Sequence, residues 1–69
     1  MSNDEKLQDA IATLDMAVNS LDHAIGILAV YQNRRIKSNN LYIQDLRNQL
    51  VLRMTNLEDL IAVGSIPTI

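Results

Sequence analysis

Leucines recur every seven residues along the first part of the chain, at positions 7, 14, 21 and 28. Ile11, Val18 and Ile25 each precede one of these leucines by three positions, which completes the a and d positions of a heptad repeat. Side chains at this spacing form one stripe along an α-helix, and such an aliphatic stripe is buried against another helix. The pattern therefore predicts a long amphipathic helix over about residues 3–37.

A second heptad stripe follows in the later part of the chain and predicts a helix over about residues 41–63. Leu28 and Ile43 are fifteen residues apart, one more than two heptads, so the two stripes are out of phase. The polar cluster at residues 38–40 predicts the turn between the helices. The residues predicted to form the seam between them are Leu7, Ile11, Leu14, Val18, Leu21, Ile25, Leu28, Ile43, Leu50, Met54, Leu57 and Ile61.

These elements predict an all-α fold in which the chain forms an antiparallel two-helix hairpin. We expect residues 1–69 to form a single domain, with residues 64–69, which include Pro67, as a short non-helical tail. One unbroken helix is the alternative. It would carry the first register onward and place Gln32, Arg35 and Asn39 in the seam, so the hairpin is favoured.

The flanks of the stripes differ in character. Ala10, Ala17 and Ala24 occupy the g positions of the first helix, and these small side chains let a further helix approach closely. Leu46 and Leu60 occupy g in the second helix. Asp15 and Asp22 lie at the e positions of the first helix, and we interpret both as solvated residues that mark the end of the buried face.

The length of 69 residues favours self-association, because the core of so small a domain rarely contributes more than ~3–5 kcal/mol. The absence of Cys excludes disulfides as a substitute. The first predicted helix is longer than the second, which leaves the stripe at Leu7 without a partner. Residues 24–31 are apolar around the whole circumference of the predicted helix, which makes Ile27, Val30 and Tyr31 candidate interface residues. We expect an oligomeric helical bundle, most simply a dimeric four-helix bundle.

Charge is segregated along the chain: residues 1–33 and 54–69 are acidic, and residues 34–53 are basic. In a hairpin this gives a basic end at the turn, the tip, and an acidic open end, the foot. Three interpretations remain open. The cations serve the C-terminal dipole of the first helix, pair with the foot of a second copy, or bind an anion such as nucleic acid, a nucleotide or an acidic protein surface. The candidate residues are Arg34, Arg35, Lys37, Arg47 and Arg53.

No set of residues in the sequence predicts catalysis, a metal site or a cofactor site. His23 falls at f, the outward position of the first helix, and lacks an orienting partner. The polar N-terminus and the short apolar runs predict no signal peptide and no membrane span, so we expect a cytoplasmic location. We expect a non-enzymatic protein–protein interaction module, an adaptor, chaperone-like or inhibitor protein with an unidentified protein partner. The alternative is a binder of phosphate-bearing ligands through the tip, distinguished by steep salt dependence.

Overall fold

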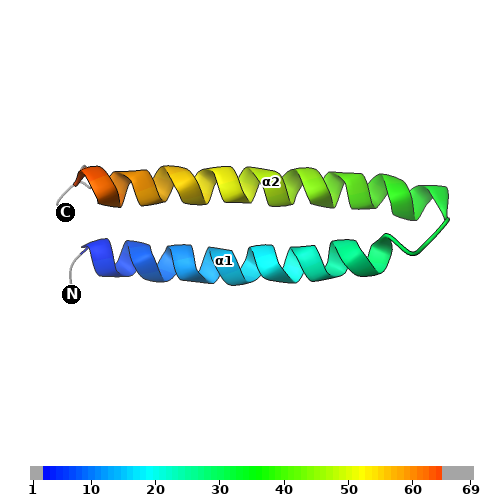
Figure 1. The fold of residues 1–69 in the computed structure, drawn as a ribbon, viewed down its shortest axis with the longest axis horizontal. Coiled ribbons are helices and arrows are strands. Elements are labelled where there is room, and N and C mark those ends of the chain that lie inside the picture. The colour runs from blue at the N-terminus through cyan, green and yellow to red at the C-terminus, as the bar shows by residue number, and fades with distance from the viewer. Residues whose placement is uncertain (1–2, 65–69) are drawn as a thin grey trace.

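The protein is a rod of two helices packed side by side in opposite directions (Figure 1). The structure is a computed structural model that describes residues 3–64. Helix α1 spans Asn3–Leu28 and helix α2 spans Arg34–Val63. The rod measures 50 × 17 × 16 Å, and the start of α1 and the end of α2 lie together at its foot. The prediction of an all-helical hairpin with two mutually packed helices is confirmed.

The turn lies at residues 29–33, where two local hydrogen-bonding arrangements end one helix and begin the next. At the end of α1, the amides of Val30 and Tyr31 donate to the carbonyls of Ile27 and Leu28. Asn33 is the N-cap of α2, with extended backbone (φ −67°, ψ 131°). Its side-chain Oδ1 accepts from the amides of Arg35 and Ile36 at 2.9 and 3.0 Å. The cap satisfies two donors that the first turn of a helix would otherwise leave free.

The predicted helix boundaries of 3–37 and 41–63 are therefore wrong at the turn. The polar cluster at residues 38–40, where the turn is predicted, is helical in α2. The reason is visible in the register, because Ile36 precedes Ile43 by seven residues and belongs to the same stripe. Ile36 is half-buried at a d position of α2, whereas a turn at residues 38–40 would place it in the first helix, at a flanking e position.

The two helices are nearly matched in length, at 26 and 30 residues, so the expected overhang of the first helix is also wrong. Leu7 is half-buried rather than unpartnered. At the foot, residues of both helices line one groove of about 330 Å³: Gln8, Ile11, Glu58, Ile61 and Ala62. The stripe of α1 is thus covered along its length by α2.

Each residue predicted for the seam is buried or half-buried. Val18 of α1 and Met54 of α2 are the buried apolar side chains in the described part of the chain, and no side chain there is fully buried. Two helices alone cover only one stripe on each other, so most seam side chains keep an edge in solvent. The hairpin therefore has a thin core.

Helix α2 ends at Val63, and Gly64 is its C-cap residue. Gly64 adopts the left-handed conformation (φ 65°, ψ 29°), which glycine reaches without a steric penalty. Its amide donates to the carbonyl of Ile61 at 3.2 Å. The tail predicted after it lies outside the described residues. Neither helix is both long enough and apolar enough to cross a bilayer, judged over the described residues.

Candidate interaction surfaces

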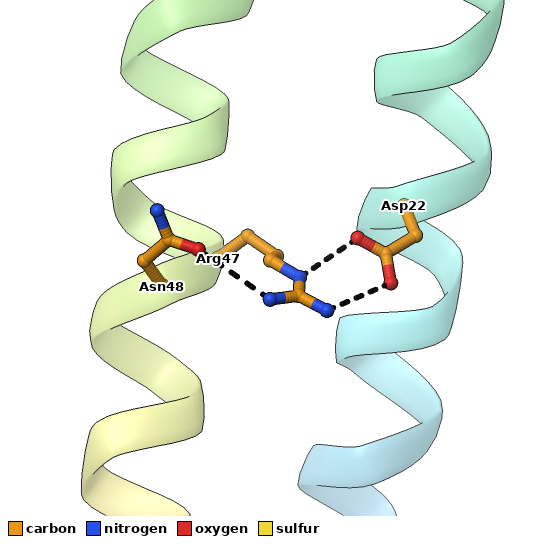
Figure 2. Close-up of polar contacts among 3 residues, drawn as sticks. All are labelled: Asp22, Arg47 and Asn48. Atoms are coloured by element: carbon orange, nitrogen blue, oxygen red, sulfur yellow. Dashed lines mark hydrogen bonds and ion pairs between the residues drawn. The ribbon is translucent and has the colours of Figure 1, made fainter.

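Arg47 of α2 and Asp22 of α1 form an ion pair across the hairpin (Figure 2). Arg47 Nε donates to Asp22 Oδ1 at 2.8 Å, and a terminal guanidinium nitrogen donates to Oδ2 at 3.2 Å. Arg47 Nη1 also donates to Asn48 Oδ1 at 3.4 Å. Two parallel bonds to one carboxylate fix the relative position of the helices as well as attracting them. The interpretation of Asp22 as a purely solvated residue is therefore wrong.

Arg47 combines a seam position in the heptad register with a charge that Asp22 stabilises. Arg47 occupies an a position in the stripe of α2, between Asn40 and Met54. The hydrogen bond from Arg47 to Asp22 raises the pKa of Arg47, and the negative charge of Asp22 acts in the same direction. Partial desolvation opposes both effects. The guanidinium of Arg47 thus binds a carboxylate of its own chain, and its role is to join the two helices at the seam.

A second polar residue interrupts the seam closer to the tip. Asn40 also occupies a, and it is only 6% exposed. Its Nδ2 donates to the backbone carbonyl of Ile25 at 3.4 Å, while its Oδ1 is buried without a hydrogen-bond partner. Asn40 belongs to the polar cluster that was predicted to form the turn. With Ile43 and Leu50 at d, the same register places Asn40 at a, three residues before Ile43, and so in the seam.

Large apolar side chains are exposed on several faces of the rod. The described part of the chain exposes more of them than it buries. They are Met16, Ile27, Val30, Tyr31, Leu41, Tyr42, Leu46, Leu52, Leu60 and Val63. The predicted interface residues Ile27, Val30 and Tyr31 are among these exposed residues. However, α1 ends at Leu28, so the prediction of an all-round apolar helix through residue 31 is wrong, and Val30 and Tyr31 lie in the turn.

The two long sides of the hairpin differ in chemistry. Gln8 and Glu58, both at e, line the same groove, so the e positions of both helices lie on one side and the g positions on the other. The e side, here called the charged side, carries the ionisable residues Asp15, Asp22, Lys37 and Glu58. The g side, here called the alanine side, carries Ala10, Ala17, Ala24, Asn39, Leu46, Arg53 and Leu60.

The tip carries Arg34, Arg35 and Lys37 in the first turn of α2. The interpretation that they serve the C-terminal dipole of the first helix is wrong, because they occupy the positive N-terminal end of the second helix. Lys37 Nζ donates to Gln32 Oε1 at 3.3 Å. Neither Arg34 nor Arg35 forms an ion pair within the described residues.

The structure does not bring all five predicted basic residues together. Arg47 lies ten residues beyond Lys37, about 15 Å along the helix, and Arg53 lies about 24 Å beyond it. Arg53 is exposed on the alanine side. The basic tip therefore consists of Arg34, Arg35 and Lys37.

Among the described residues, no three His, Cys, Asp or Glu side chains lie close enough to hold a metal ion. His23 is exposed on α1.

Comparison of the chain with known proteins found no matching family model, no matching curated protein and no matching solved structure.

Proposed function

We propose that this protein is a small, non-enzymatic helical interaction module that acts as a homo-oligomer, most simply a dimeric four-helix bundle, and binds another protein. In this proposal it works in the cytoplasm as an adaptor, chaperone-like or inhibitor protein. The proposal depends on the balance of buried and exposed apolar groups rather than on a catalytic arrangement.

The observation that carries the proposal is that the hairpin buries only Val18 and Met54 among its described apolar residues, while ten large apolar side chains are exposed. Apolar side chains scattered over a surface are normal, but here they outnumber the core. Because apolar burial is the main favourable term in folding, a domain with so few buried groups gains most by covering its outer faces. A second copy and a protein partner both supply such a cover.

Sedimentation equilibrium of the full chain at micromolar concentration tests the first part. We expect at least a dimer, and circular dichroism on the same samples should show helical content that falls on dilution. A concentration-independent, fully helical monomer would contradict the proposed self-association. Affinity capture from the native host followed by mass spectrometry would then identify the protein partner.

A second candidate function, binding of a phosphate-bearing ligand such as nucleic acid or a nucleotide, has one observation in its favour. Arg34 and Arg35 lie at the N-terminal end of α2, where the helix dipole does not favour cations. Neither forms an ion pair with a described carboxylate, so local stability does not account for them.

Fluorescence anisotropy with a labelled single-stranded oligonucleotide tests this second candidate. Binding through the tip should weaken steeply as salt rises and should be lost in Arg34→Gln/Arg35→Gln. Arg53→Gln is the matched control, because it removes a cation that lies away from the tip. Binding that is equal in both variants, or that is insensitive to salt, would contradict a phosphate site at the tip.

A further inference from the structure

The chain exposes more surface than a compact protein of its mass. Its accessible area is 5449 Å², whereas a compact monomer of 7.7 kDa exposes about 4300 Å². The difference of about 1100 Å² exceeds the roughly 800 Å² that each partner buries in a standard stable interface. The surplus of the whole chain is thus of the size that one interface with a second copy would bury.

The alanine side is the better of the two long sides for such an interface. Covering the charged side would desolvate Asp15, Glu58 and the Asp22–Arg47 pair, which is unfavourable without new partners. The alanine side carries one charged residue, Arg53, among its g positions. Leu46 and Leu60 are 51% and 39% exposed there, so both have apolar area left to bury.

The distribution of charge selects the orientation of the second copy. The tip carries three cations, and the foot carries the carboxylates of Glu5, Asp9, Glu58 and Asp59 with one lysine. These ends are separated by a rod 50 Å long, which is several times the screening length of about 8 Å at physiological salt. Within one copy the two ends therefore do not attract each other, but in an antiparallel pair of rods they meet.

We propose that two copies of this chain pair through their alanine sides, tip to foot, about a two-fold axis across the rod. This inference rests on the proposed self-association and specifies its surface and geometry. The axis stacks α1 on α1 and α2 on α2, because an isologous contact places the same surface on both partners. Ala10, Ala17 and Ala24 then face their counterparts, and small side chains at a helix contact permit a short distance between axes.

Paired substitutions test which side forms the interface. Leu46→Gln/Leu60→Gln removes apolar groups from the alanine side. Met16→Gln/Leu52→Gln is the matched control, because these side chains are at least as exposed but lie at f, on the outer faces. Sedimentation equilibrium should show the dissociation constant rising at least tenfold for the first variant and unchanged for the control, with circular dichroism confirming helix in both.

Cysteine cross-linking tests the orientation without relying on those variants to fold. The chain has no Cys, so Ala17→Cys and Ala10→Cys each introduce a unique thiol. Ala17 lies near the middle of the rod, and Ala10 lies about 10 Å further toward the foot by the helical rise. In a tip-to-foot pair, a short bis-maleimide should join two copies efficiently at position 17 and poorly at position 10.

Each result has a distinct meaning. A wild-type monomer would overturn both the proposed function and this inference. A dimer that is weakened by the Met16/Leu52 variant instead would overturn the inference and leave self-association intact. Equal cross-linking at positions 10 and 17, or none at either in a demonstrated dimer, would overturn the tip-to-foot geometry.

Discussion

Arg47 reaches across the hairpin from a seam position of α2 and binds Asp22 of α1 through both carboxylate oxygens. Replacing Asp22 and replacing Arg47, each on its own, should have opposite effects on the melting temperature. Asp22→Ala leaves an unpaired cation against the seam and should lower the melting temperature. Arg47→Leu completes the aliphatic stripe, leaves Asp22 free in solvent and should raise it. Asp15→Ala, at the equivalent position one heptad earlier, is the control and should change little. Equal melting temperatures for Asp22→Ala and Asp15→Ala would contradict a role for the pair.

The pH dependence of this pair follows from the raised pKa of Arg47. A pKa raised in the folded state contributes stability that is complete below the unfolded value and is lost as pH rises through the folded value. For arginine both values lie far above neutral pH. The difference in melting temperature between wild type and Asp22→Ala should therefore be constant from pH 6 to 9. A difference that disappears toward pH 9 would show that another group is responsible.

Asn40 should limit the stability of the seam, because its Oδ1 is buried without a partner. Asn40→Leu removes the unsatisfied group and should stabilise the hairpin by about 1–2 kcal/mol in urea denaturation. Asn19→Leu is the control, since Asn19 is exposed on α1, and should stay within about 0.5 kcal/mol of wild type. Destabilisation by Asn40→Leu would mean that the bond to the Ile25 carbonyl outweighs the orphaned oxygen.

Two methionines provide a matched measure of the core. Met54 is 8% exposed in the seam, and Met16 is 69% exposed on the outer face of α1. Met54→Ala should reduce the free energy of unfolding by about 2–4 kcal/mol, which is enough to unfold much of so small a domain. Met16→Ala should change it by less than about 0.5 kcal/mol. Thermal melts that shift equally would refute the assigned buried face.

Asn33 should be the residue that positions the turn. Asn33→Ala removes the acceptor for the Arg35 and Ile36 amides and should cost about 1 kcal/mol. Asn33→Asp keeps the acceptor and adds a negative charge at the N-terminal end of α2, so it should match or exceed wild-type stability. Asn39→Ala should have a smaller effect than Asn33→Ala, because Asn39 is exposed and caps no helix. If Asn39→Ala is the more damaging, the turn lies closer to residue 39.

Arg34 and Arg35 should affect helix stability and assembly in opposite directions. Arg34→Glu/Arg35→Glu places acids in the first turn of α2, where each should stabilise the helix by ~0.3–1 kcal/mol at low salt. The same change should weaken a tip-to-foot dimer, because carboxylates then meet at both ends. The expected result is a higher melting temperature when dilute and a higher dissociation constant by sedimentation. High salt should weaken the wild-type dimer in the same direction.

The seam was readable from the sequence because heptad spacing is a strong signal. Every predicted seam residue, from Leu7 to Ile61, is buried or half-buried. The turn was not readable, since Asn33 and Asn40 carry the same local preference for caps and turns. Which of the two asparagines lies at the turn depends on whether Ile36 packs in the seam as part of α2, and that packing is a tertiary effect.

The contacts between the two helices could not be predicted, because the turn was predicted too far along the chain. Shifting the turn toward the N-terminus changes which residues of α1 lie level with which residues of α2. The pairing of Asp22 with Arg47, twenty-five residues apart, exists only at the observed alignment. The dipole interpretation of Arg34 and Arg35 failed for the same reason, because the boundary decides which helix they belong to.

Helix α1 begins and helix α2 ends at the foot, and this arrangement determines how the hairpin responds to mechanical force applied to these helix ends (Figure 1). Pulling the ends apart loads the seam perpendicular to its length, so its layers separate one after another rather than sliding together. Peeling would start near Leu7 and Ile61, meet the Asp22–Arg47 pair midway, and reach the Asn33 cap last. A hairpin loaded in this way unfolds progressively from the foot at low force. A partner bound to its outer sides would hold the two helices together against that force.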